Sequence, residues 1–367
     1  MKKILLLLML ATSVLAQAKA KYGIVMPASL KPGDKVAILS PGSTPSDSSV
    51  IKAMEVLKGW GLNPVRGKYV TNRYHGWAGT AAEREADLMW ALRDNSIKAI
   101  ICSRGGYGSA QILYNVPLDT LKKYNKWLVG YSDITALHSA MVKAGHMSIH
   151  GSMCGRLAKT GGTDEYSERL RKLLFGKEMP NVEAPAHAYN HTGKAKGILI
   201  GGNLSVFTQV SGSADYDFLD RDFVKDKDVV LFFEDVSESV NRVASMLFQM
   251  KLKGTLDHVK GIIVGRFTEV TSLSGYESMD QMLHEFLDEY QIPICYDFPT
   301  SHDESWNTPM IEGCPVELTV TPEKSTLKFK KNYRLVELTG SSDHSEYAAH
   351  SECSELMSHS HFIKKIS

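Results

Sequence analysis

Residues 127–135 read Trp-Leu-Val-Gly-Tyr-Ser-Asp-Ile-Thr, an apolar run followed at once by a polar turn. The first four residues predict a buried strand, and the apolar spacing from Ile134 to Ala144 predicts a helix. Ser132 therefore occupies a tight strand-to-helix turn, which projects its hydroxyl above a sheet beside free N–H groups of the helix start. On these residues alone a helix cap is favoured over a nucleophile, because Ser is a preferred cap and Ile134 replaces the second Gly of the pattern G-x-S-x-G.

The same alternation of strand and helix precedes this turn. Short apolar runs at 35–40 and 99–102 are each followed by a segment with helical spacing. Alternating strands and helices predict a parallel sheet covered by helices on both faces. We therefore assign residues 21–174 to an N-terminal parallel-sheet α/β domain that carries the Ser132 turn.

A second domain is predicted after a change in composition. Residues 175–196 lose the periodicity and collect Pro, Asn and Gly, which predicts a linker. Strand-like and helix-like runs then resume, and alternation at 316–320 and 326–329 is typical of an antiparallel hairpin. Residues 197–340 are therefore predicted to form a C-terminal mixed α/β domain.

The overall composition sets broad limits on function. The chain has 367 residues, of which 43% are hydrophobic, with 42 basic against 41 acidic side chains. This length fits about two domains, and the apolar fraction excludes a wholly disordered or collagen-like chain. Because the charges nearly cancel, no basic patch indicates nucleic acid as the main partner.

The first twenty residues have the three parts of a secretory signal peptide in order. Met1-Lys2-Lys3 is basic, residues 4–10 are apolar, and small residues at 16, 18 and 20 fit an A-x-A cleavage site. The apolar run is shorter than the ~20 residues of a membrane-spanning helix, and a buried N-terminal helix is the less favoured alternative. Cleavage at this site changes the formal net charge from +1 to −2, because it removes three lysines and no acid. We expect an exported, periplasmic protein without membrane insertion after cleavage.

The C-terminal end and the cysteines carry weaker signals. Residues 341–367 hold eight Ser and four His with little apolar content, which favours a disordered tail over adventitious metal binding. No C-x-x-C occurs, so the sequence gives little support for a zinc ribbon or a thioredoxin-type redox motif. Whether Cys295 and Cys314 pair is left open by the sequence. The five cysteines are Cys102, Cys154, Cys295, Cys314 and Cys353.

A glycine-rich loop is predicted beside the Ser132 turn. Arg104-Gly105-Gly106-Tyr107-Gly108 follows the apolar run 99–102, and in a parallel sheet both turns lie at the carboxyl edge, where ligands bind. Closely spaced glycines let N–H groups face an anion, so an oxyanion donor and a plain tight turn are equally compatible with the loop. The loop lacks the P-loop Lys and G-x-G-x-x-G, which disfavours nucleotide binding.

A serine nucleophile requires a base, and the base requires an acid that orients it. His302 lies in a loop directly after an apolar strand, where catalytic side chains are commonly mounted. His138 fits a helix face better than a catalytic position. The remaining histidine candidates before the tail include His146 and His150.

Glu234 is the candidate acid. It ends the very apolar run 229–233, and a carboxylate there needs a partner or water, since unpaired burial is costly. A salt bridge to Arg242 or a charge at a helix end is the plainer explanation of this residue.

These segments together resemble the LD-carboxypeptidases (muramoyltetrapeptide carboxypeptidases), serine peptidases with a Ser-Glu-His triad. Each motif is modest, but seven occur in order between about residues 30 and 335. One departure from the family pattern is that Thr300-Ser301 precedes His302, where the family often has Gly-His. The matching stretches are 33–37, 104–108, 130–133, 201–204, Glu234-Asp235, 261–267, and His302 with Asn307 and Pro309.

The resemblance implies roles for particular residues. Ser132 is the implied nucleophile, His302 the general base and Glu234 the residue that orients the base. The N–H groups of Gly106 and Asp133 are the implied oxyanion hole, and no metal or organic cofactor is required. Because Ser132 belongs to the first domain and the other two triad members to the second, we expect the active site in a cleft between the domains.

The implied reaction is cleavage of the L,D amide that releases terminal D-Ala from murein tetrapeptides. The partner is therefore a murein tetrapeptide or related muropeptide, and the resemblance suggests a homodimer. Arg104 and Asn203 are guessed from position to bind the substrate.

The sequence leaves two rival functions. The related microcin C7 self-immunity branch acts on a peptide- or aminoacyl-nucleotide in the cytoplasm, and the export signal disfavours it. The other rival is a periplasmic ligand-binding protein, which has two α/β domains around a cleft and no turnover.

Overall fold

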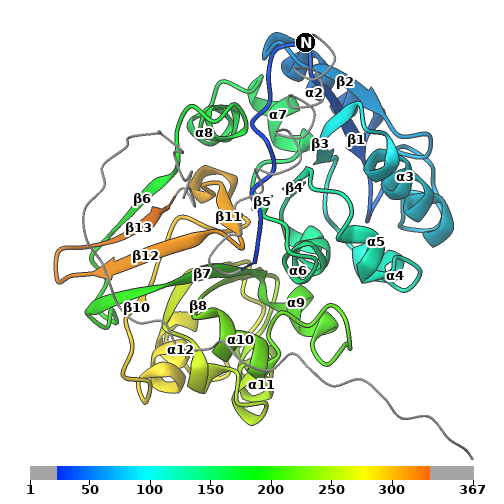
Figure 1. Cartoon of the computed structure of the whole chain (residues 1–367). Helices are drawn as coiled ribbons and strands as arrows, with labels where there is room; N and C mark the ends of the chain where they lie inside the picture. The colour runs from blue at the N-terminus through cyan, green and yellow to red at the C-terminus, as the bar shows by residue number, and fades with distance from the viewer. Residues whose placement is uncertain (1–22, 331–367) are drawn as a thin grey trace, which may run out of the picture. The chain divides into compact units, whose positions relative to one another are not determined.

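The computed structural model describes residues 23–330 (Figure 1). The predicted signal peptide at 1–20, the predicted tail at 341–367 and Cys353 lie outside these residues. Within them, no helix is long and apolar enough to cross a membrane. The described part contains two β-sheets with helices packed against them.

The first sheet has six strands in the order β11-β5-β4-β3-β1-β2. Its strands pair in parallel, except that β11 runs antiparallel to β5. The predicted strands at 35–40, 99–102 and 127–130 are confirmed. The bounds are β1 Lys35–Leu39, β2 Asn63–Arg66, β3 Ile97–Cys102, β4 Trp127–Gly130, β5 Ser148–His150 and β11 Met310–Glu312.

Helices cover both faces of this sheet, as the alternation predicts. Val36 and Ile38 of β1 pack into one apolar core with α2 and α7, whereas Ala37 and Leu39 pack into a second core with α3 and α6. Strands buried on both faces are typical of parallel α/β sheets. The helices are α2 Asp47–Gly59, α3 Ala81–Arg93, α4 Ser109–Leu113, α5 Leu118–Leu121, the 3-10 helix η1 Ser132–Ile134, α6 Thr135–Lys143, α7 Cys154–Thr160 and α8 Glu165–Leu174.

The second sheet is mixed, which confirms the predicted fold class of the C-terminal half. Its seven strands lie in the order β10-β9-β8-β7-β12-β13-β6. The four strands from β10 to β7 are parallel, and the remaining three pair antiparallel, including the predicted hairpin β12–β13. The bounds are β6 Asn181–Pro185, β7 Gly193–Asn203, β8 Val229–Val236, β9 Gly261–Thr268, β10 Ile294–Cys295, β12 Pro315–Val320 and β13 Lys324–Phe329.

The helices of the second half follow its parallel strands. α9 begins directly after β7, and α11 follows β8. Buried residues of α11 and α12 pack against the apolar strands β8 and β9 in one continuous core. The bounds are α9 Leu204–Val210, α10 Arg221–Lys227, α11 Val240–Leu252, η2 Leu256–His258, α12 Met279–Leu287 and η3 Glu304–Trp306.

The segment 175–196, predicted as a linker, is not free of regular structure. It contains β6 and the first residues of β7, because Val182 and Ala184 alternate with exposed neighbours and pack on the sheet beside β13. The strand is too short, and too close to Pro residues, for its alternation to stand out in the sequence. The chain also returns late to the first sheet, through β11. The domain bounds themselves stay a prediction.

Four cysteines lie in the described part, and all four are buried and free, so Cys295 and Cys314 do not pair.

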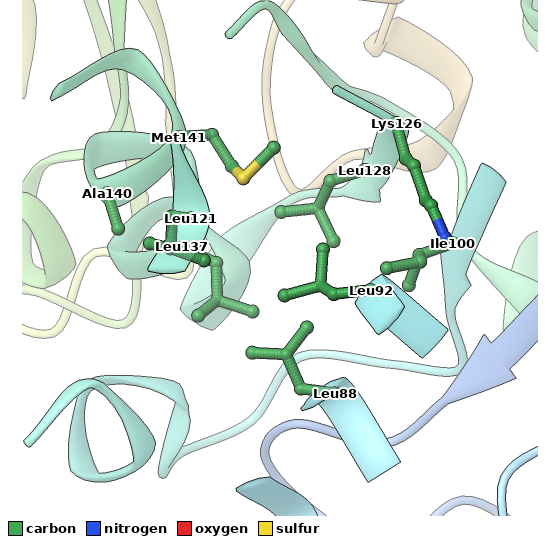
Figure 2. Close-up of a pocket in the computed structure, with 9 residues that line it drawn as sticks. All are labelled: Leu88, Leu92, Ile100, Leu121, Lys126, Leu128, Leu137, Ala140 and Met141. Atoms are coloured by element: carbon green, nitrogen blue, oxygen red, sulfur yellow. The ribbon is translucent and has the colours of Figure 1, made fainter. Parts of the chain in front are cut away.

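A small apolar cavity of about 10 Å³ lies between α3, β3 and α6 (Figure 2). The only polar group in its lining, the Lys126 ammonium, donates hydrogen bonds to the carbonyls of Ala91 and Asp94. A water needs about that much space and two to four polar partners, so this cavity is a packing feature of the core.

Candidate active site

Ser132 lies in the turn between β4 and α6, as predicted. Its φ is +63°, a left-handed conformation that costs a non-Gly residue on the order of 1–3 kcal/mol and is concentrated at functional sites. Tyr131, not Ser132, precedes the first turn of η1, and no side chain caps that turn. The cap interpretation, which the residues alone favoured, is therefore not what the structure shows.

The hydroxyl of Ser132 is instead the first member of a hydrogen-bonded chain. Ser132 Oγ lies 2.9 Å from His302 Nε2, and His302 Nδ1 lies 2.6 Å from Glu234 Oε2. With Nδ1 protonated and donating to the carboxylate, Nε2 is free to accept the Ser132 proton. The structure thus brings together the three residues singled out in the sequence as nucleophile, base and acid.

The environment of His302 favours its charged form. Burial by itself lowers the pKa of this imidazole, but the charge of Glu234 and its hydrogen bond outweigh burial and raise the pKa above the ordinary 6.5. The Glu234 side chain is fully buried, and that of His302 is 16% exposed, so water screens their attraction little. Arg242 pairs with Glu238 instead, at 3.7 Å, and Glu234 lies inside strand β8, so neither the salt bridge nor a helix-end charge explains Glu234.

The glycine-rich loop after β3 approaches the Ser132 turn closely. A Cβ on Gly105 would lie 2.9 Å from Ser132 Cβ and 3.2 Å from the Asp133 nitrogen. Gly106 has φ +94°, and a Cβ there would lie 2.2 Å from Ser43 Oγ. Among the hydrogen bonds of residues 23–330, none uses the N–H of Gly106 or Asp133. These two donors are therefore available to an oxyanion at the Ser132 turn.

The side chain of Asp133 holds the turn and the loop together. It is buried and accepts hydrogen bonds from the N–H and the hydroxyl of Ser109, at 2.9 and 2.8 Å. Burial raises the pKa of this carboxyl despite the Ser109 bonds and the nearby Arg84 charge. Sequence reasoning did not identify Ser109 or Arg84 as part of the site. The available signal for Ser109 was its position directly after the 104–108 motif.

Arg104 and Asn203 lie at the carboxyl ends of β3 and β7. Arg104 is exposed, and within residues 23–330 its guanidinium donates a 3.5 Å hydrogen bond to the Thr44 carbonyl. Asn203 is buried; its amide nitrogen donates to Asp235 at 2.8 Å, and its oxygen accepts the Val206 N–H at the start of α9. These hydrogen bonds use the Asn203 side chain to stabilise the fold. The contacts with substrate that were suggested for Arg104 and Asn203 stay predictions.

Arg266 anchors the loop that carries His302, a role that sequence reasoning missed. Its guanidinium pairs with Asp297 at 2.5 Å and with Asp303 at 3.4 Å, and it lies 4.4 Å from the ring centre of Trp306. The signal was present, since Arg266 belongs to the matched stretch 261–267. Because this residue holds the chain on both sides of His302, it fixes the loop on which the base is mounted.

The other histidine candidates do not reach Ser132. His138 is fully buried on α6, where it bonds the Gly130 carbonyl and the Ser148 hydroxyl, and burial lowers its pKa to about 4. Its bond to Gly130 supports the end of β4, two residues before Ser132. His146 bonds the Leu121 carbonyl, and His150 is buried with both ring nitrogens unpaired in the described part of the chain.

Outside the triad, one group of side chains in residues 23–330 has metal-ligand composition and spacing. It consists of His191, His284 and Asp288, and one ligand atom from each lies within 4.8 Å of the others. None of these residues is hydrogen-bonded to Ser132, His302 or Glu234.

Comparisons with known proteins match both halves of the chain. Residues 36–151 match the family model of the LD-carboxypeptidase N-terminal domain, and residues 196–318 match that of the C-terminal domain. A putative carboxypeptidase of Synechocystis is 34% identical over 76% of this chain and 89% of its own length. The murein tetrapeptide carboxypeptidase of Pseudomonas aeruginosa is 27% identical over 76% of this chain and 93% of its own length.

Solved structures share the fold. The muramoyltetrapeptide carboxypeptidase of Oxalobacter formigenes has a TM-score of 0.70 and 27% identity, covering 81% of this chain and 99% of its own. The microcin C7 self-immunity protein in complex with adenosine monophosphate also has a TM-score of 0.70, at 22% identity over 83% of this chain and 98% of its own, and shows the fold alone. With both family models matched in order, the chain belongs to the LD-carboxypeptidase family of serine peptidases.

Proposed function

We propose that this chain is a serine carboxypeptidase that releases terminal D-Ala from murein tetrapeptides. The observation that carries the proposal is the chain of hydrogen bonds from Ser132 through His302 to Glu234, beside two unused N–H groups. The names of the Pseudomonas and Oxalobacter relatives support the choice of a murein tetrapeptide as substrate.

In the proposed reaction, His302 Nε2 accepts the Ser132 proton while Oγ attacks the carbonyl carbon of the L,D amide. The N–H groups of Gly106 and Asp133 donate to the oxyanion of the tetrahedral intermediate. His302 then gives its proton to the leaving D-Ala nitrogen, and the acyl-enzyme forms. Water, deprotonated by His302, releases the tripeptide and regenerates the Ser132 hydroxyl.

Two residues are proposed for supporting roles. Glu234 holds His302 in the orientation that this transfer requires and stabilises the imidazolium. Arg104 is exposed at the start of the glycine-rich loop and carries a charge opposite to that of the terminal carboxylate of the substrate.

The deciding experiment incubates purified protein with murein tetrapeptide and follows tripeptide and free D-Ala by mass spectrometry. The wild type should produce both, and Ser132→Ala should produce neither while keeping the same thermal unfolding midpoint. Ser245→Ala is the matched control and should leave turnover intact, because among residues 23–330 that hydroxyl bonds only a carbonyl of its own helix, α11. Turnover by Ser132→Ala contradicts the nucleophile assignment.

Two further assays separate the rivals. A peptidyl- or aminoacyl-nucleotide, offered under the same conditions, tests the activity of the microcin C7 self-immunity branch, with which this chain shares the fold. Faster cleavage of the nucleotide conjugate than of tetrapeptide overturns the proposed substrate. A fluorophosphonate probe that labels the wild type but not Ser132→Ala excludes a binding protein without turnover.

Export to the periplasm and a homodimer belong to the same proposal. Residues 1–20 carry the signal-peptide pattern, and intact-mass measurement of protein recovered from the cell envelope should show their loss. A protein recovered with residues 1–20 still attached contradicts export by this signal. Mass photometry or sedimentation tests the dimer.

A further inference from the structure

Three side chains with metal-binding groups meet where α12 ends against the sheet edge. His284 lies in α12, and Asp288 follows the helix as its C-terminal cap. His191 lies just before β7 and forms an antiparallel bridge with Ile294 of β10. One ligand atom from each of the three side chains lies within 4.8 Å of the others. The three side chains therefore come from two segments that are distant in sequence, the approach to β7 and the end of α12, and β10 lies beside the first of them.

The spacing of these atoms suits a small divalent cation. His191 Nε2 and Asp288 Oδ1 are 3.2 Å apart, and two ligands of a tetrahedral zinc ion with bonds of about 2.0–2.1 Å are separated by about 3.3 Å. His284 and Asp288 are four residues apart, the spacing that places two side chains on one face of a helix. Asp288 is exposed, so its side chain can adjust to an ion.

The ring of His284 and the backbone of His191 are held in place by their surroundings. The ring of His284 stacks on Tyr189, with centroids 4.4 Å apart and planes within 13°. His191 is fixed through its backbone, whose N–H and carbonyl bond those of Ile294 at 2.9 and 3.1 Å. Ligands that need no rearrangement lose less entropy when a metal binds.

The polar groups here are incompletely satisfied without a cation. The His284 Nδ1 atom is buried and has no hydrogen-bond partner within residues 23–330. Asp288 places a carboxylate at the C-terminal end of α12, where the helix dipole is also negative, so a cation is favoured there. An ion pair of His191 with Asp288 alone explains neither the third ligand nor the buried nitrogen of His284.

We propose that His191, His284 and Asp288 form a structural site for a divalent transition metal, with Zn²⁺ the best-suited ion. Two imidazoles and one carboxylate are a ligand set that zinc accepts, with water completing the tetrahedron. The ion joins the end of α12 to the segment just before β7, which in turn forms a backbone bridge with β10, an edge strand of only two residues. It takes no part in the peptidase reaction, and the proposal does not rest on the reaction assigned to Ser132.

The test uses the full chain after removal of metal with a chelator. Added ZnCl₂ should raise the thermal unfolding midpoint of the wild type in a saturable way, because an ion that binds only the folded state stabilises it. His284→Ala and the double variant His191→Ala/His284→Ala should lose this shift. MgCl₂ at the same concentration should produce none, since Mg²⁺ prefers oxygen ligands.

Two controls make the outcome specific. His258→Ala removes a half-buried histidine from η2, outside the site, and should keep the zinc-dependent shift. Ser132→Ala should keep it too, so failure of the peptidase proposal and failure of the metal proposal are distinguishable. Zinc bound by histidines of residues 341–367 is counted separately, because the double variant should lose one equivalent by elemental analysis and retain any others.

Asp288→Asn gives a second variant that should fold normally, since Asp288 is exposed. It should weaken zinc binding at least tenfold, because the amide is a poorer ligand than the carboxylate. The proposal is overturned if the wild type shows no zinc-dependent shift, or if the double variant shows the same shift and the same number of bound equivalents as the wild type.

Discussion

At the scale of single residues, the site depends on the charge state of His302. A base must be neutral to accept a proton, yet the imidazolium must be stable enough to form during the reaction. Glu234 is fully buried and 2.6 Å from His302 Nδ1, so it stabilises the imidazolium and raises the pKa of the ring above 6.5 despite burial. The strained φ of Ser132 places the hydroxyl where this base can reach it.

This arrangement predicts the pH dependence of activity. Because the pKa of His302 is raised, kcat/KM should fall with decreasing pH along an acid limb centred above 6.5. Glu234→Gln removes the charge, so the limb should move to lower pH and kcat should fall by a factor on the order of 10²–10⁴. A pH–rate profile of both proteins checks this. A wild-type limb centred at or below 6.5 contradicts the proposed role of Glu234.

At the scale of elements, the close approach of two turns creates the donor pair. The loop after β3 reaches the turn after β4 because Gly105 has no side chain. The side chain of Asp133 stabilises the contact between the two turns, since its carboxylate accepts two hydrogen bonds from Ser109 at the start of α4. The oxyanion donors are therefore positioned by packing between neighbouring βα turns, a common location for ligand sites in parallel sheets.

A single methyl group should disturb this pair. In Gly105→Ala the new Cβ would meet Ser132 Cβ at 2.9 Å and the Asp133 nitrogen at 3.2 Å, so one turn must move. Misplacing an oxyanion donor costs on the order of 10²–10³ in kcat, and we expect a loss of that size with the secondary structure retained. Steady-state kinetics and circular dichroism measure the two effects.

Gly155→Ala is the matched control for this prediction. Gly155 lies in α7, and a Cβ there meets nothing within 4 Å. The exchange should leave kcat unchanged and, by the higher helix propensity of Ala, add up to about 1 kcal/mol to the free energy of unfolding. Equal activity of Gly105→Ala and Gly155→Ala would show that the close approach is unimportant for turnover.

At the scale of the whole molecule, the described part is held together by contacts between the two sheets. β11 comes late in the chain but pairs with β5 of the first sheet. Its Glu312 is fully buried and accepts the N–H of Gly201 in β7 at 3.0 Å. Beside it, the Asn203 N–H donates to Thr135 at the start of α6. These bonds connect the sheet that carries Ser132 to the sheet that carries Glu234.

Glu312 predicts a pH-dependent stability. Burial raises the pKa of this carboxyl well above 4.5, against the weaker lowering effect of the Gly201 bond. The folded state therefore keeps the proton that the unfolded chain releases above pH 4.5, so this contribution to stability declines as pH rises until the folded pKa is passed. Glu312→Gln keeps an acceptor for Gly201 and removes the titration.

The free energy of unfolding of Glu312→Gln should therefore exceed that of the wild type by a margin that grows above pH 4.5. Denaturant unfolding at a series of pH values measures this margin. Glu312→Ala is the comparison, because it leaves the Gly201 N–H unpaired and should be destabilised by about 1–3 kcal/mol. A margin that is constant with pH contradicts the protonated state assigned to Glu312.

The local sequence by itself determined the elements and the candidate residues of the site. The strands at β1, β3 and β4, the helices between them and the Ser132 turn all follow from residue types within a few positions of one another. Glu234 ends an apolar run, and Ser132 and His302 lie in a turn and a loop that follow one, where side chains are placed at the edge of a sheet. The resemblance to a family then assigned them roles.

Only the tertiary structure decided what depends on distant segments. Ser132 and His302 are 170 positions apart and meet because the two sheets pack into a shared core. The same holds for β6 in the expected linker, for β11, for the capping contacts of Asn203 and for the support of the His302 loop by Arg266. The physical reason is that periodicity reports how a segment is buried, whereas its partner is selected by packing and hydrogen bonds across the core.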